Sequence, residues 1–227
     1  MPEETPRTLN HFAVLAFKEA YWTLSAEARA AFHRNWLAGL RAAAQNVDIY
    51  QPTESDADLI VWSALPAEDK TGTATFFECL AKANNPYRPF LQPVHSLWGY
   101  TRPSQYTKTR SPQELDPFAA TRKAYLVIYP FVKTTDWYLM SREARQGMMN
   151  EHIRIGKQYE DIRQLLLYSF GVQDQEFVVV YETDDLQRFS DLVNDLRSTE
   201  GRRYTLRDTP LHSAVYHPAE ETLALWL

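Results

Sequence analysis

A tyrosine, a histidine and a glutamate lie in one stretch of the chain, and side chains of these types could act in chemistry. Tyr129 lies near the end of a β-like run over 123–131, and Glu182 closes a second β-like run over 176–182. His152 lies between these runs, in a segment whose apolar residues recur at helical spacing. An imidazole framed by two such strands could ligate a metal, as in the wall of a haem pocket.

The segment around His152 has one apolar helical face. Met148, His152, Ile155 and Tyr159 are spaced i, i+4, i+7 and i+11, which places all four on that face. His152 is the only one of them that titrates near neutral pH. Two interpretations stay open: an iron-ligating histidine, or a core histidine bonded to a backbone carbonyl.

An internal repeat predicts the elements that position these residues. The segment 22–29 (WTLSAEAR) recurs as 137–145 (WYLMSREAR), each time after a β-like run and at the start of a helix. Ser25 and Ser141 are suitable N-caps, and a glutamate follows each in the first turn, where it interacts favourably with the helix dipole. When the two segments are aligned, Trp36 corresponds to His152. One half would thus keep a packing residue where the other has a residue able to bind a metal.

Both halves follow the order β-α-β-β-α-β, which is the ferredoxin-like unit. In the first half we expect the elements at 10–18, 25–45, 47–51, 58–64, 66–83 and 94–101. In the second half we expect them at 123–131, 141–159, 165–170, 176–182, 185–198 and 209–216. The predicted fold class is α+β, with two tandem ferredoxin-like units whose antiparallel sheets are covered by helices, as in a dimeric α+β barrel. We expect an N-terminal half over 8–102, a proline-punctuated linker over 103–121 and a C-terminal half over 122–227 that carries the site.

Composition limits the function classes. With 44% hydrophobic and 23% charged residues, the chain is typical of a soluble globular protein. A formal net charge of −5 without a basic stripe argues against a nucleic-acid partner. Neither an apolar run of about 18 residues nor a signal-peptide pattern occurs, so we expect no membrane span and a cytoplasmic location. The aromatic fraction of 13% fits a large flat ligand, and equally a well-packed core or a subunit interface.

Cysteine and histidine positions add little beyond His152. The single cysteine, Cys79, cannot form an internal disulfide, and no Cys/His cluster has the spacing of a zinc site. The other histidines have no partner pattern, so we expect surface or structural roles for His11, His33, His95, His212 and His217.

Four motifs of the second half together resemble the chlorite dismutase superfamily and, within it, the coproheme decarboxylases. They are the tyrosine strand 129–139 (YPFVKTTDWYL), the pair Glu151-His152, the stretch 159–163 (YEDIR) and the strand 174–183 (DQEFVVVYET). As a double ferredoxin-like fold, the resemblance covers nearly the whole chain. It implies a haem enzyme that oxidatively decarboxylates propionates of coproheme III with hydrogen peroxide to give haem b. It also implies a homo-oligomer in the form of a closed ring, commonly a pentamer.

The resemblance implies roles for five residues. His152 would be the proximal ligand of the haem iron, and Glu182 would accept a hydrogen bond from its Nδ1–H. Tyr129 matches the tyrosine that loses an electron and a proton and then attacks a propionate. Lys133 and Arg197 match cations that bind propionates.

The resemblance leaves the residue on the opposite side of the iron open. Chlorite dismutation in the family depends on an arginine thirteen residues after the proximal histidine, and an ungapped count gives Leu165 there. A one-residue gap gives Gln164, and a two-residue gap gives Arg163. In the linker, Arg110 stands where the most similar decarboxylases have a histidine, and an arginine is too basic to act as a base near neutral pH. The resemblance thus favours coproheme decarboxylation. A non-catalytic haem-binding or haem-handling protein remains the alternative, and chlorite dismutation is disfavoured.

Overall fold

The computed structural model describes residues 7–107 and 111–227. Its first half contains β1 (Thr8–Phe17), α1 (Glu19–Trp22), α2 (Ala26–Ala43), β2 (Asn46–Pro52), β3 (Leu59–Pro66), α3 (Gly72–Asn84), η1 (Asn85–Tyr87) and β4 (Leu91–Thr101). Its second half contains β5 (Tyr125–Lys133), α4 (Thr135–Leu139), α5 (Arg142–Gly156), β6 (Arg163–Tyr168), β7 (Phe177–Thr183), α6 (Leu186–Arg197), η2 (Glu200–Tyr204), β8 (Thr205–Arg207), β9 (His212–Tyr216) and α7 (Ala219–Ala224). Among the described helices, none has the length and apolar character needed to cross a membrane.

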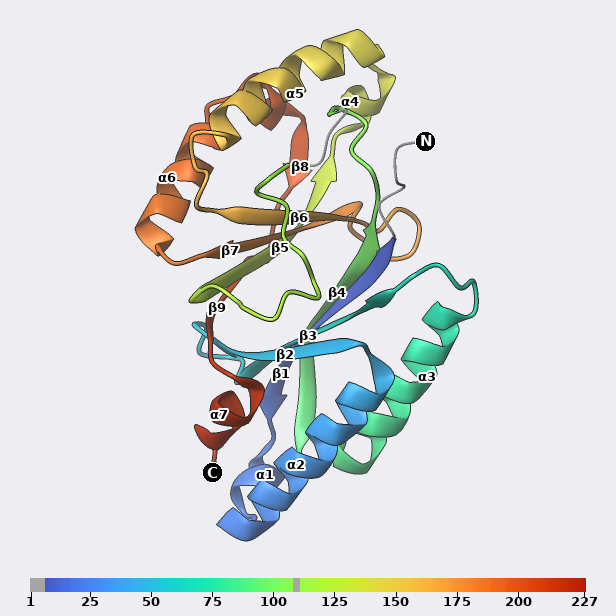
Figure 1. The fold of residues 1–227 in the computed structure, drawn as a ribbon, viewed down its shortest axis with the longest axis vertical. Coiled ribbons are helices and arrows are strands. Elements are labelled where there is room, and N and C mark those ends of the chain that lie inside the picture. The colour runs from blue at the N-terminus through green and yellow to red at the C-terminus, as the bar shows by residue number, and fades with distance from the viewer. Residues whose placement is uncertain (1–6, 108–110) are drawn as a thin grey trace.

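Eight of the described strands close into one antiparallel barrel. Their order is β7-β6-β4-β1-β3-β2-β9-β5, and β5 pairs back with β7, while β8 pairs with the end of β5. Each half supplies four adjacent strands, and the halves meet where β4 pairs with β6 and where β2 pairs with β9. Helices α2 and α3 cover the sheet of the first half, and α5 and α6 cover that of the second (Figure 1). The arrangement confirms the predicted fold class.

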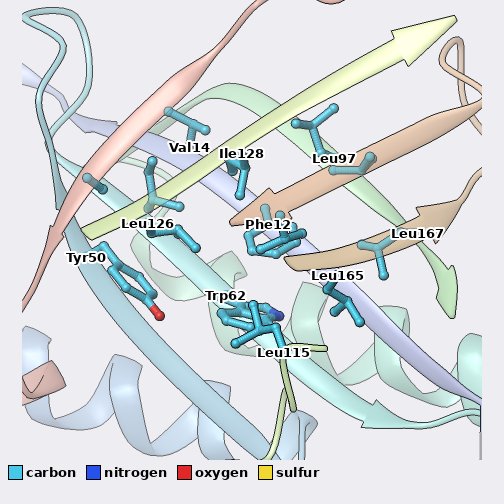
Figure 2. Close-up of a cluster of buried hydrophobic side chains, with 14 of the residues drawn as sticks. Phe12, Val14, Tyr50, Trp62, Leu97, Leu115, Leu126, Ile128, Leu165 and Leu167 are labelled. Carbon is cyan, nitrogen blue, oxygen red and sulfur yellow. The ribbon is translucent and has the colours of Figure 1, made fainter. Parts of the chain in front are cut away.

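The barrel encloses a packed apolar core rather than a channel. Alternate residues of each strand point inward, and Figure 2 labels nine of them together with Leu115 of the segment between the halves: Phe12, Val14, Tyr50, Trp62, Leu97, Leu126, Ile128, Leu165 and Leu167. The rings of Phe12 and Trp62 stack with centroids 5.2 Å apart. Leu115 comes from the segment between the halves and is completely buried in this core, so that segment closes the barrel instead of only linking two domains.

Both predicted helix caps are confirmed. The Ser25 hydroxyl accepts a hydrogen bond from the backbone N–H of Ala28 at 3.3 Å, and Ser141 accepts one from Ala144 at 3.2 Å. Each cap satisfies one of the backbone donors that the first turn of a helix leaves unpaired. The repeated serine therefore starts the equivalent helix, α2 or α5, in each half.

Some element boundaries differ from those expected. The helix expected from residue 66 begins only at Gly72, because Asp69 holds a turn: its carboxylate accepts from the backbone N–H of Thr71 at 2.9 Å and from the Thr71 hydroxyl at 2.6 Å. The last strand begins at His212 rather than at Thr209. The preceding segment instead contributes β8, which extends the sheet beside Lys133.

Candidate functional site

The floor of the candidate site is the outer surface of the second half's sheet. Since side chains alternate along a strand, those that do not point into the barrel point toward α5 and α6. We call this surface the site face. Its members are Val127, Tyr129 and Phe131 on β5, Gln164, Leu166 and Tyr168 on β6, and Phe177, Val179 and Tyr181 on β7.

Helix α5 covers the site face loosely. In the first half, α2 buries Trp36 completely against its sheet, whereas none of the residues of α5 is fully buried. Ile155 and Tyr159 do pack against the edge of the site face. Leu166, by contrast, keeps 38% of its surface exposed although it lies on the floor. The floor is therefore less covered around Leu166 than in its middle, where Val127, Val179 and Tyr181 are buried in a core cluster.

His152 projects from α5 and is neutral at physiological pH. Burial lowers the pKa of its imidazole to about 4, and the nearby positive charge of Lys133 acts in the same direction, while Glu151 opposes it. A neutral imidazole keeps a lone pair on one ring nitrogen, which is what a metal ligand requires. The position equivalent to the packed Trp36 thus holds a group able to bind a metal.

Tyr129 lies on the same side of the sheet, next to a second tyrosine. Burial raises the pKa of its phenol, which therefore stays protonated at neutral pH. The ring of Tyr181 lies nearly parallel to that of Tyr129 with centroids 6.2 Å apart, and a hydrogen bond between the two hydroxyls partly offsets the effect of burial. The charges of Asp208, Arg197 and Arg202 also act on Tyr129. Tyr181 and Arg202 were not found by sequence reasoning: in the strand motif 174–183 only Glu182 was given a role, and Arg202 lies outside the four motifs.

Three cations lie at this end of the site face. The ammonium group of Lys133 donates to the carbonyl of Gly201 at 3.2 Å and lies 4.6 Å from the centroid of the Trp137 ring. Burial lowers the pKa of Lys133 to about 8, so it is still mostly charged at neutral pH. Arg197 and Arg202 both bond to one carboxylate oxygen of Asp208, at 3.2 and 2.6 Å. The charges of Arg197 and Arg202 act on Tyr129, whereas that of Lys133 acts on His152.

Glu182 is not placed beside His152. It follows Tyr181 on β7 and so points into the barrel, away from α5. Its carboxylate is completely buried and lies 3.6 Å from the guanidinium of Arg122, which bonds more closely to Asp48 at 2.9 Å. Burial raises the pKa of Glu182 to about 7 despite the opposing charge of Arg122. The expected hydrogen bond from His152 to Glu182 is therefore absent from this arrangement, because the strand turns that carboxylate to the wrong face.

The structure also separates the three residues considered for the position opposite the iron. Leu165 is buried in the barrel core and Arg163 pairs in register with Glu182, so neither belongs to the site face. Gln164 pairs with Tyr181 and shares its face. Of the three, only Gln164 lies where it could contact a group held by His152. The fourth residue considered, Arg110, lies outside the described residues.

Two histidines for which we expected surface or structural roles, His95 and His212, form a chain of hydrogen bonds with Glu54. His212 Nδ1 lies 2.7 Å from a carboxylate oxygen of Glu54, and its Nε2 lies 3.0 Å from Nδ1 of His95. These residues are 158 and 117 positions apart from His212, so no local pattern could have joined them. They fasten β9 and β4 across the barrel.

The fold, with His152 on α5 and Tyr129 on the site face, defines an α+β barrel protein built from two ferredoxin-like halves. The chain belongs to the chlorite dismutase family, whose model matches residues 20–216. A coproheme decarboxylase from Mycolicibacterium smegmatis is 30% identical over 173 residues, which cover 75% of this chain and 71% of the relative.

Solved structures agree in fold. The chlorite dismutase from Candidatus Nitrospira defluvii in complex with imidazole matches with a TM-score of 0.81 at 21% identity, over 96% of this chain and 94% of that one. A doubly substituted variant of the same enzyme gives a TM-score of 0.83 at 21% identity, over 96% and 95%. At these levels of sequence identity, the similarity shows a shared fold and does not show a shared reaction.

Proposed function

We propose that the chain binds an iron porphyrin between α5 and the site face and oxidatively decarboxylates coproheme III to haem b with hydrogen peroxide. One observation carries this proposal: a neutral imidazole, a protonated tyrosine and three cations surround the same loosely covered surface. The kinship with a coproheme decarboxylase supports it. A single histidine is enough for this metal, since a porphyrin supplies the other equatorial ligands itself.

The arrangement suits this substrate in charge as well as in shape. Coproheme carries four propionates, and burying a carboxylate without a partner costs several kcal/mol. Lys133 sits at the end of β5 beside Arg202, and Arg197 stands at the end of α6, so propionates on one edge of the macrocycle would meet cations. Aromatic and aliphatic members of the site face, such as Val179 and Phe131, would contact the flat ring.

The reaction balances with one peroxide for each propionate. A propionate, hydrogen peroxide and a proton give a vinyl group, carbon dioxide and two waters, so each propionate loses two electrons to peroxide. With an iron porphyrin bound, peroxide at the iron would supply both oxidising equivalents. Tyr129 would give up the hydrogen of its hydroxyl, as an electron and a proton, to the first equivalent and would regain a hydrogen atom from the propionate side chain. The second electron would pass from the propionate to the other equivalent as carbon dioxide leaves. The ring of Tyr181 lies nearly parallel to that of Tyr129, with centroids 6.2 Å apart.

The residue opposite His152 favours this reaction over chlorite dismutation. Gln164 occupies the site face where the family's dismutation chemistry requires an arginine, and Arg163 points into the barrel. A neutral amide can hydrogen-bond to peroxide but does not supply the positive charge that holds an oxyanion. The alternative, a haem-binding protein without efficient catalysis, shares His152 but gives no role to Tyr129.

Tyr129→Phe tests the proposal. The variant keeps the ring and loses one hydroxyl, so coproheme binding should weaken by no more than about 0.5 to 1.5 kcal/mol. Decarboxylation should stop, because phenylalanine has no O–H to release. The assay is mass spectrometry of the porphyrin after stepwise addition of peroxide, with Tyr125→Phe on the same strand as the matched control. Conversion by Tyr129→Phe at the wild-type rate would assign the redox step to another residue, and failure of the wild type would favour the non-catalytic alternative.

A further inference from the structure

A cavity lies on the outer side of the barrel, at the seam where β4 of one half pairs with β6 of the other. It has a volume of about 350 Å³, at the small end of the range for ligand pockets. We call it the seam pocket and define it by three cations and three aromatic residues: Arg7, Lys70, Arg102, Tyr100, Tyr168 and Phe170. None of these residues contributes to the iron site except Tyr168, which lies at the end of the site face.

The seam pocket carries unbalanced positive charge. Among the described residues, neither Arg7, Lys70 nor Arg102 forms an ion pair, although the chain as a whole has a net charge of −5. The one carboxylate at its wall, Asp69, already accepts hydrogen bonds from the backbone and hydroxyl of Thr71 at 2.9 and 2.6 Å. Three cations against one carboxylate that is already hydrogen-bonded leave an excess of positive charge at the pocket, which suits an anionic ligand.

Its floor suits a flat apolar group. Tyr100 and Tyr168 are direct partners across the β4–β6 seam, and the hydroxyl of Tyr100 is fixed by Thr73 at 2.8 Å. The guanidinium of Arg102 lies 5.2 Å from the centroid of the Tyr168 ring. Phe170 remains 44% exposed beside them, which is unusual for a ring of its size. A ligand that stacked here would cover apolar surface and meet charge at its edge.

The pocket is connected to the iron site by aromatic contacts. The Phe170 ring meets that of Phe177 at 4.9 Å between centroids, and Phe177 stacks on Phe131 at 4.5 Å. Phe177 and Phe131 both belong to the site face. The two rings meet edge to face at 81°, so the contact joins the seam pocket to the floor of the site through packed side chains.

We propose that the seam pocket binds the pyrrole-propionate edge of a carboxylated porphyrin outside the iron site. The naming of a porphyrin rests on the proposed function; the charge and the aromatic floor by themselves select a planar aromatic carboxylate. The volume accommodates one edge of a macrocycle rather than the whole ring. Such a site would hold an incoming or outgoing porphyrin by its carboxylates next to the position where it reacts.

Calorimetric titration with iron-free coproporphyrin III tests the inference, using protein already loaded with one equivalent of coproheme. We expect one further site that weakens with added salt and does not accept the tetramethyl ester of the same porphyrin. Lys70→Gln/Arg102→Gln should weaken this site by roughly tenfold. Arg34→Gln/Arg88→Gln removes the same charge from exposed positions of the first half and should leave it unchanged.

Three results would overturn the inference: no second site, equal binding of the ester, or equal losses in the two double variants. The last of these would point to the overall charge of the protein instead of the pocket. If the protein fails to take up coproheme, the same titration of the unloaded protein with the two double variants still tests the seam pocket. Failure of the iron site and failure of the seam pocket are thus distinguishable.

Discussion

Glu182→Gln should make the protein more stable at alkaline pH. The pKa of Glu182 is raised to about 7 in the folded protein, against 4.5 for an ordinary glutamate, because the carboxylate is completely buried. The folded state then holds a proton that the unfolded chain has lost, so stability is fully present below pH 4.5 and falls as the pH rises through 7. At about 1.4 kcal/mol for each pH unit in that window, ionisation lowers the free energy of unfolding by about 3 kcal/mol. Glutamine has nearly the shape of glutamate but does not ionise, so the variant does not lose this free energy of unfolding at high pH.

Arg122 does not need Glu182 as a partner, which is why the substitution should not open a new defect. Its guanidinium donates to Asp48 at 2.9 Å and to the carbonyls of Asp116 and Pro117 at 2.9 and 2.7 Å, and lies 4.5 Å from the Trp62 ring centroid.

Urea unfolding of the wild type and Glu182→Gln at pH 5 and pH 8 measures the effect, with the exposed Glu160→Gln as control. We expect the free energy of unfolding of Glu182→Gln, relative to that of the wild type, to be about 3 kcal/mol higher at pH 8 than at pH 5. The same variant should bind coproheme as the wild type does, since Glu182 faces the barrel interior. An unchanged pH dependence would refute the burial argument, and a loss of porphyrin affinity would show that this carboxylate acts on His152 after all.

Three further predictions concern the iron site. His152→Ala should abolish high-affinity binding of ferric haem and coproheme, as measured by the Soret band. The same substitution should lower the free energy of unfolding by less than about 1 kcal/mol. Trp36→Ala, at the equivalent packed position, should lower it by about 3 to 5 kcal/mol in the same urea assay. Lys133→Ala should weaken coproheme more than haem b, by roughly 1.5 to 3 kcal/mol in a fluorescence titration, and equal losses for both porphyrins would remove the propionate assignment. Gln164→Ala should lower the rate of decarboxylation without changing the free energy of unfolding, whereas Leu165→Ala should cost about 2 to 5 kcal/mol of stability; the reverse pattern would exchange their faces.

Most of the fold could be predicted from the sequence because its signals are local. The repeated tryptophan and serine motif marks a strand end and a helix start in each half, and Ser25 and Ser141 form the caps that their residue type favours. The order of elements then follows from periodicity. The closure of the eight strands into one ring does not follow from these signals, since the β4–β6 and β2–β9 pairs join residues from different halves. Nor does the sequence show that Leu115 of the linker fills the barrel.

The candidate site could be predicted in part. The charge of Arg197 acts on Tyr129, and that of Lys133 acts on His152; the roles assigned to these residues stay predictions. Glu182 could not be placed correctly because neighbouring residues of a strand face opposite sides, so a shift of one residue exchanges core and site. The same limit applies to Gln164 and Leu165, whose faces depend on the register with β7.

The difference between the two halves follows from one helix. α2 and α5 share a cap, a length of several turns and a place over equivalent strands, yet α2 buries Phe32, Trp36 and Leu40 while α5 buries no residue completely. A helix that is not held by its own core must gain stability elsewhere, because ordering its backbone costs about 1 to 2 kcal/mol per residue. A bound porphyrin that contacts both α5 and the site face would supply that stability. The lack of a fully buried residue on α5 is therefore what we expect of a helix that helps to hold a ligand, with His152 at the position where the other half keeps Trp36.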